Sequence, residues 1–189
     1  MPKIVDRHAY RQELLSQCFD LFAKHGYGAI TMRQIAQGLG VSTGTLYHYF
    51  PSKESIFNQL VEYLSYEDTT EERFEELGDR PTLSSRVEAI VECIVKREDY
   101  FLKQMLILID YLQHQDSQAI LNNPILQKAA ARYEEAVMTY LQIPDPDLAT
   151  FIISLIDGLL IRRLLRGDRV SWEAQSKIFV RAVEAYVES

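Results

Sequence analysis

The stretch TMRQIAQGLGVSTGTLYHYF, residues 31–50, decides the fold. Thr31 and Gln34 fit a capping box, in which the hydroxyl accepts from the backbone three residues on and the glutamine reaches back. Gly40 follows Ala36 by four residues, at a place where a tight turn needs positive φ. Two short helices that cross steeply need a small residue at their contact and a glycine at the turn. The stretch therefore predicts a helix-turn-helix.

The second helix of this unit is expected to be capped by Ser42 or Thr43 and to turn Leu46 and Phe50 back toward the first. Such a helix enters the major groove of DNA. Its candidate contacts carry hydroxyls or aromatic edges, or let the backbone approach closely: Thr43, Gly44, Thr45, Tyr47, His48 and Tyr49. The alternative is a compact helical corner, with Tyr47 or Tyr49 partly in the core and a plain surface histidine at position 48.

Charge is divided unevenly along the chain. The net charge is −7, but residues 1–64 hold six Lys and Arg against five Asp and Glu, whereas residues 65–189 hold fourteen against twenty-two. Because a phosphate backbone attracts basic surfaces, a DNA-binding surface is expected in the first third. There, Arg33 is the candidate for bidentate contact with a guanine, and Lys53 for a phosphate at a helix start.

The strings TMRQIAQGLGVS and GTLYHYFPSKE, within residues 26–54, resemble the DNA-binding domain of the TetR/AcrR family of repressors. The resemblance covers about the first sixty residues. It places the family's DNA-contacting positions on Thr31, Arg33, Ser42, Thr43, Gly44, Tyr47, His48, Tyr49 and Lys53, and Lys3, Arg7 and Arg11 could add phosphate contacts from the N-terminal arm. Many members have histidine where this chain has Tyr49, and the recognition helix has no Lys or Arg, so base specificity is not readable from it.

The whole chain is expected to be all-α, because 3.6-residue periodicity recurs and no strand pattern does. Nine helices are predicted, at about residues 6–25, 32–39, 43–49, 53–77, 83–97, 100–115, 125–142, 147–165 and 172–187. The alternative for the fifth and sixth is one kinked helix. The predicted helices and the family resemblance divide the chain into a helix-turn-helix head, residues 1–52, and a ligand-binding and dimerisation domain, residues 53–189. A long helix over about residues 53–77 is expected to link the two.

The segment FIISLIDGLLIRRLL, residues 151–165, is apolar nearly all round and must be buried on more than one face. The family resemblance implies that the last two helices form a four-helix interface in a homodimer. The residues expected there are Phe151, Leu155, Ile156, Leu159, Leu160, Phe179, Val183 and Tyr186. The alternative is burial within one subunit, and Asp157 within the segment needs a partner if it is buried.

Large, adaptable side chains recur on the middle helices, where members of this family bind ligands. They are Tyr100, Phe101, Met105, Leu108, Tyr111, Tyr133, Met138 and Tyr140, of which Phe101, Met105, Leu108, Tyr111, Tyr133 and Met138 are the candidate ligand contacts. Ordinary core packing is the alternative for each of them. Asp110, in the run MLILIDYLQ, could pair with a cationic ligand or be solvated or salt-bridged.

The resemblance implies a repressor whose partners are double-stranded operator DNA, a second copy of the chain and an unidentified hydrophobic or amphipathic effector. Neither a cofactor nor a metal site is expected, since Cys18 and Cys93 lie outside any metal-ligand spacing, and Cys18 is expected to be a buried free thiol. No signal peptide or membrane span is evident, so a cytoplasmic protein is expected. An enzyme is a rival, as is a helical interaction module with a vestigial head, but the four histidines are scattered and no nucleophile–base spacing occurs.

Overall fold

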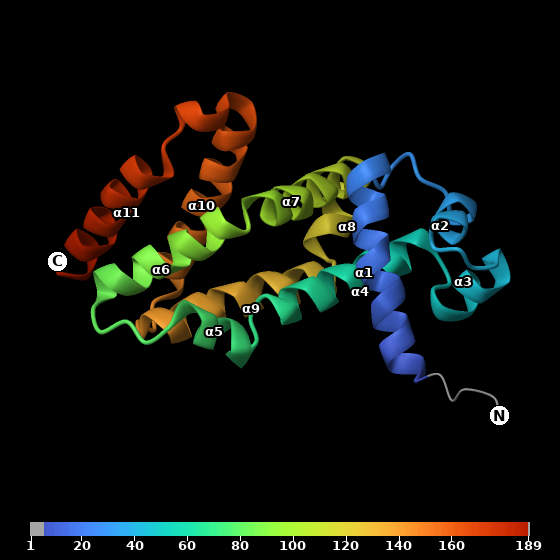
Figure 1. The fold of residues 1–189 in the computed structure, drawn as a ribbon, viewed down its shortest axis with the longest axis horizontal. Coiled ribbons are helices and arrows are strands. Elements are labelled where there is room, and N and C mark those ends of the chain that lie inside the picture. The colour runs from blue at the N-terminus through green and yellow to red at the C-terminus, as the bar shows by residue number, and fades with distance from the viewer. Residues whose placement is uncertain (1–5, 189) are drawn as a thin grey trace. The chain divides into compact units, whose positions relative to one another are not determined.

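The computed structural model describes residues 6–188, which form helices and no strands. The α-helices are α1 (Arg7–His25), α2 (Met32–Gly38), α3 (Thr43–Tyr49), α4 (Lys53–Glu67), α5 (Glu71–Leu77), α6 (Leu83–Lys96), α7 (Glu98–Gln113), α8 (Ser117–Leu121), α9 (Pro124–Leu141), α10 (Pro146–Arg166) and α11 (Trp172–Val187). A 3-10 turn, Gly167–Arg169, lies between the last two (Figure 1). The all-α prediction is confirmed, whereas the predicted number of nine helices is wrong.

Two differences account for the higher count. The helix predicted over residues 53–77 is interrupted, because α4 ends at Glu67 and α5 begins at Glu71. The polar stretch expected to be irregular contains the short helix α8, whose N-cap Asp116 accepts from the backbone N–H of Gln118. The alternative of one kinked helix fits the fifth and sixth predicted helices, since α6 and α7 are separated by the single residue Arg97.

The chain divides into two compact units, each with its own core. The first comprises the described residues up to Tyr66 together with Leu106–Ala129, and the second comprises Glu67–Met105 together with Ala130 onward. Among residues 6–188, no helix is long and apolar enough to span a bilayer.

The first unit is built around the inner faces of α1 to α4. Phe22 of α1, Ile35 of α2, Leu46 of α3 and Phe57 of α4 are all at most 1 % exposed. Cys18 is fully buried beside them, and burial raises the pKa of its thiol to about 12. The prediction that Cys18 is a buried free thiol is therefore confirmed.

The second unit packs α6, α10 and α11 around one apolar cluster. The cluster holds Val87, Val91, Ile94, Leu141, Leu148, Ile152, Ile156, Leu160, Phe179, Val180 and Val183. The members from α6 recur at spacings of four and three residues and those from α10 at spacings of four, as on the buried face of a helix, and α9 adds Leu141. This core accounts for one apolar face of the segment from residue 151 to 165, the face that carries Ile152, Ile156 and Leu160.

The same core corrects the set of residues expected at a dimer interface. Five of the eight are buried within the chain itself: Ile156, Leu159, Leu160, Phe179 and Val183. Leu155 is partly buried against the same cluster, while Phe151 and Tyr186 are about half exposed. The sequence shows that these helices are apolar, but it does not separate the face that packs internally from the face left for a partner.

Candidate nucleic-acid interface

The turn between α2 and α3 has the predicted local structure. The backbone N–H of Thr31 donates to Gln34 Oε1 at 2.9 Å, and the backbone N–H of Gln34 donates to Thr31 Oγ1 at 3.3 Å, which completes the capping box. Gly40 adopts φ +67°, and Val41 N–H donates to the Ala36 carbonyl at 3.0 Å. The glycine is required here, because a side chain is strained at this φ.

Helix α3 presents one buried and one exposed face. Ser42 is its N-cap and accepts the backbone N–H of Thr45 at 2.9 Å, while Leu46 and Phe50 are fully buried, as predicted. Tyr47 is 50 % exposed, and its neighbours Thr43, Gly44 and His48 are exposed as well. These side chains lie on the surface that a recognition helix offers to a major groove.

The remaining predicted DNA contacts differ in how exposed they are and in whether their polar groups already have partners within the chain. Thr31 and Arg33 are exposed at the start of α2. Tyr49 is partly buried, with its ring edge-on to Tyr10 at 5.6 Å between centroids, so α1 holds it in place. Thr45 Oγ1 lies 2.8 Å from Ser42 Oγ, so both hydroxyls already serve the start of α3.

Three cations were expected in the N-terminal arm. Arg7 and Arg11 are exposed, and the Arg11 guanidinium lies 5.7 Å from the centroid of the Phe50 ring. Lys3 lies outside the described residues.

Gly44 is unnecessary for the packing of the head. A Cβ placed on it would meet only Ser42 Oγ within 4 Å, at the ordinary distance of 3.7 Å. Its φ is not positive, so no backbone strain calls for glycine either. Glycine within a helix costs about 0.5–1 kcal/mol relative to alanine. The cost is explained if an external backbone approaches α3 at this position.

Lys53 has a structural role that its position in the sequence did not reveal. Its Nζ donates to the carbonyl oxygens of Tyr27, Gly28 and Ile30 at 2.6, 3.2 and 3.0 Å and lies 4.6 Å from the Tyr27 ring centroid. Burial lowers the pKa of this ammonium. An ammonium has three N–H donors, and here all three are used. Lys53 therefore fastens the segment between α1 and α2, and has no donor left for a DNA phosphate.

Replacing Lys53 by methionine is expected to lower the free energy of unfolding by about 1.5–3 kcal/mol, because hydrogen bonds to a charged group are lost and three carbonyls are left unpaired. Lys24→Met, the same change at an exposed site in α1, is the control and is expected to leave stability unchanged. Chemical denaturation measures both. Unchanged stability of Lys53→Met together with weaker DNA binding would instead make Lys53 a direct phosphate contact.

A family model described as "Bacterial regulatory proteins, tetR family" matches residues 14–60, which include the whole helix-turn-helix. Over these residues the chain is similar to the TetR family. The HTH-type transcriptional repressor KstR2 of Mycobacterium tuberculosis is 45 % identical over 51 residues, which are 27 % of this chain and 26 % of KstR2. The matched segment thus spans about a quarter of the first curated relatives, and it is the head that they share.

Solved structures of low identity share the fold over nearly the whole chain. A TetR transcriptional regulator from Legionella pneumophila has a TM-score of 0.69 at 19 % identity and covers 95 % of this chain and 98 % of its own. The transcriptional regulator FadR of Bacillus subtilis, solved in complex with stearoyl-CoA, has a TM-score of 0.63 at 20 % identity. The match covers 90 % of this chain and 95 % of the FadR chain.

The segment after α1 is also held by α7. Asp110 Oδ2 accepts the backbone N–H of Gly28 at 2.9 Å, and His114 Nδ1 lies 2.7 Å from the Asp110 carbonyl oxygen. A Cβ on Gly28 would lie 2.2 Å from the His114 ring, so a side chain here would displace the imidazole. Asp110 thus accepts a hydrogen bond within the protein. This favours the interpretation as a solvated or salt-bridged residue over pairing with a cationic ligand.

The six candidate ligand contacts are divided between the two units. Tyr111 is buried in the first unit, where it stacks on Phe57 at 3.7 Å between ring centroids, and Leu108 is 37 % exposed. In the second unit, Phe101 and Met105 pack against the apolar cluster, Met138 is partly buried, and the Tyr133 hydroxyl donates to Asp68 at 3.0 Å. Among residues 6–188, no group of three or more His, Cys, Asp or Glu is arranged to hold a metal ion.

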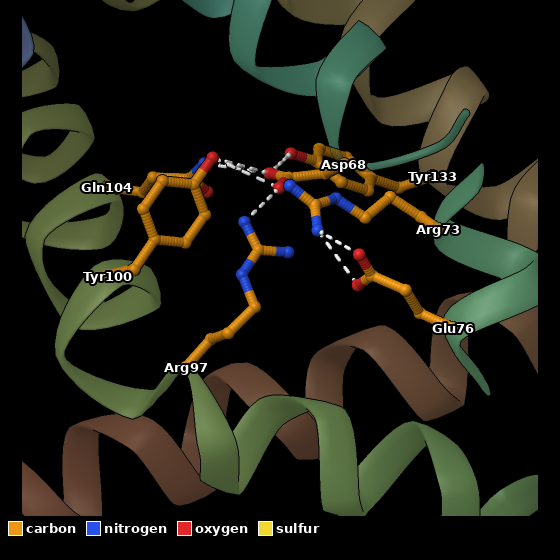
Figure 2. A network of polar contacts seen from close by, with 7 residues as sticks. All are labelled: Asp68, Arg73, Glu76, Arg97, Tyr100, Gln104 and Tyr133. Atoms are coloured by element: carbon orange, nitrogen blue, oxygen red, sulfur yellow. Dashed lines mark hydrogen bonds and ion pairs between the residues drawn. The ribbon is translucent and has the colours of Figure 1, made fainter. Parts of the chain in front are cut away.

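Asp68 is the polar residue that sequence reasoning missed. It lies in the junction between α4 and α5 with its side chain only 2 % exposed, and side chains from several other parts of the second unit donate to it (Figure 2). Burying a carboxylate is costly unless it is hydrogen-bonded, so this contact is a strongly constrained feature. Asp68 lies in a run of acidic residues, and such residues are usually solvated, so the sequence does not single it out as buried.

Proposed function

We propose that this chain is a DNA-binding transcriptional regulator, a repressor that binds a pseudo-palindromic operator as a homodimer. The observation that supports this most is the exposed face of α3, which follows the Gly40 turn and carries hydroxyl and aromatic groups around Gly44. We further propose the functional division into a head, residues 1–52, and an effector and dimerisation domain, residues 53–189. A hydrophobic or amphipathic small molecule bound by the latter would release the operator.

This function is tested with DNA from the gene neighbourhood of the protein, compared with random DNA of the same length. Binding measured by fluorescence anisotropy is expected to be about a thousandfold or more tighter for one neighbouring fragment than for random DNA. Equal affinity for both would favour the rival of a helical interaction module. A turnover screen that finds a substrate would favour an enzyme.

The proposed dimer rests on the outer faces of α10 and α11. Exposed apolar side chains there are Phe151, Ile161, Leu164, Leu165, Ile178, Tyr186 and Val187. Asp157 is exposed on the same helix, and partial desolvation raises the pKa of its carboxyl. Large exposed apolar surfaces of this kind are unusual on monomers and are typical of protein–protein interfaces. A two-fold axis would bring each face against its copy.

Replacing Ile178, which is 62 % exposed, by glutamate is expected to convert the dimer into folded monomers, because a charge is then desolvated at the interface. Leu121→Glu is the control, since Leu121 is 63 % exposed but lies on α8. Sedimentation velocity gives the mass, and circular dichroism checks the fold. A dimer that survives Ile178→Glu would place the interface elsewhere.

A further inference from the structure

Four donors converge on the carboxylate of Asp68. At Oδ1, Arg97 Nη2 donates at 2.8 Å and the Tyr100 hydroxyl at 3.0 Å. At Oδ2, Gln104 Nε2 donates at 2.8 Å and the Tyr133 hydroxyl at 3.0 Å. The donors come from α7, α9 and the residue between α6 and α7, all within the second unit (Figure 2).

The electrostatics of this cluster are those of a receptor for an anion. Burial and then the Asp68 charge raise the pKa values of Tyr100 and Tyr133, so both are neutral O–H donors. Burial alone would lower the pKa of Arg97, but the hydrogen bond and charge of Asp68 outweigh it and the pKa rises. One cation and three neutral donors thus enclose one carboxylate. Without an anion, the four donors would be left unpaired in a buried site.

Asp68 lies outside the helices, whereas most of its partners lie on them. It lies in the short junction between α4 and α5, and Thr70, the N-cap of α5, makes no side-chain capping hydrogen bond. Helix α5 has no buried residue, although Phe74 stacks on Tyr140. The donors, by contrast, are carried on or beside the long helices α6, α7 and α9. The donors thus lie on or next to long helices, and the carboxylate that they bind lies in the non-helical junction between α4 and α5.

We propose that Arg97, Tyr100, Gln104 and Tyr133 form a binding site for the anionic head, a carboxylate or a phosphate, of an amphipathic effector, and that Asp68 occupies it in the absence of that effector. An incoming anion uses all four donors as they stand and displaces only Asp68. Phe101 and Met105, partly buried beside the apolar cluster, suit the tail. Because Asp68 follows α4 directly, its release removes one contact at the end of the helix that begins at Lys53.

A cationic ligand fits these contacts less well. The lone pairs of Asp68 are already engaged by four donors. The aromatic faces of Tyr100 and Phe101 are covered by the Arg97 guanidinium, at 4.2 and 4.9 Å from their ring centroids. A cation would have to expel Arg97, and would gain one carboxylate while three donors stayed without a new partner. Exchange of one anion for another keeps every donor paired.

Chemical rescue of the vacated site tests the proposal. Asp68→Ala is expected to lower the thermal midpoint, and acetate or inorganic phosphate to restore at least about half of that loss at saturation, because a ligand that binds the folded state stabilises it. Sodium chloride at equal ionic strength is expected to restore none of it. The double variant Asp68→Ala/Arg97→Met, which lacks the cation, is expected to respond to neither anion. Stronger rescue by acetate identifies a carboxylate head, and stronger rescue by phosphate a phosphate head.

A second variant keeps the test decisive if Asp68→Ala does not fold. Asp68→Asn preserves the shape but competes less well with an anion, so decanoate is expected to bind it with a Kd at least about tenfold lower than wild type. Equal or weaker decanoate binding by Asp68→Asn would overturn the proposal. So would an Asp68→Ala protein that is folded but responds to acetate and phosphate no more than to chloride, or stabilisation of the wild type by choline that Asp68→Asn abolishes.

The consequence for DNA rests on the proposed function, whereas the site itself does not. Saturating decanoate is expected to weaken operator binding by the wild-type protein, and thermal midpoints report on the site without DNA. Anion rescue in a protein that does not bind DNA would keep the site and reject the regulator. Specific DNA binding without anion rescue would keep the regulator and reject the site.

Discussion

Replacing Leu46 by alanine is expected to lower the free energy of unfolding of the head by about 2–5 kcal/mol, because a fully buried leucine leaves a cavity in a small core. Leu46 comes from the inner face of α3, opposite the candidate DNA-binding surface. The substitution therefore tests the packing of the recognition helix without removing a side chain from the candidate DNA-binding surface. Chemical denaturation followed by circular dichroism measures the change.

Tyr47→Ala, at the adjacent position on α3, provides the matched control. Tyr47 is 50 % exposed, so its removal is expected to change stability by no more than about 0.5 kcal/mol. The same variant is expected to lose operator affinity, because its ring lies on the surface offered to DNA. If Tyr47→Ala destabilised the head as much as Leu46→Ala, the tyrosine would be a core residue and the compact-corner interpretation would hold.

Replacing Phe179 by alanine is expected to cost about 3–5 kcal/mol in the stability of the second unit. The side chain is 1 % exposed within the apolar cluster between α6, α10 and α11. The sequence pattern had placed it at an interface with a second chain. The structure instead assigns it to the core, so the variant should unfold more readily at every protein concentration.

Phe151→Ala makes the same chemical change at a position that is 47 % exposed on α10. It is expected to leave the unit folded and to weaken self-association, which sedimentation at several protein concentrations would detect. A Phe179→Ala protein of normal stability that only dissociates would contradict the packing described here. It would return Phe179 to the interface.

The parts of this fold that could be predicted are those determined by neighbours in sequence. The capping box joins residues 31 and 34, the Gly40 turn closes on Ala36, and Ser42 caps α3 three residues on. Each feature is set by residue type and spacing over a few positions. The helix-turn-helix could therefore be located to within one residue, and its buried positions, Leu46 and Phe50, were also predicted correctly.

The features that could not be predicted depend on distant partners. The continuous helix expected over residues 53–77 is interrupted where Asp68 meets Arg97 and Tyr133, 29 and 65 residues away along the chain. Lys53 donates to carbonyls 23–26 residues before it, and a backbone acceptor leaves no mark in sequence. Likewise, periodicity shows that α10 and α11 are apolar on several faces without showing which face meets which neighbour.

The most direct test of the central claim, that the head binds DNA, is the affinity for the operator measured at 50 and 200 mM salt. Wild-type affinity is expected to fall by about a thousandfold or more between these concentrations, since contacts to phosphates release counterions. Arg33→Ala is expected to bind roughly tenfold or more weakly. Lys177→Ala removes the same charge from an exposed pair on α11 and should bind as wild type does. Affinity that is independent of salt and no tighter than for random DNA, in all three proteins, would contradict the account.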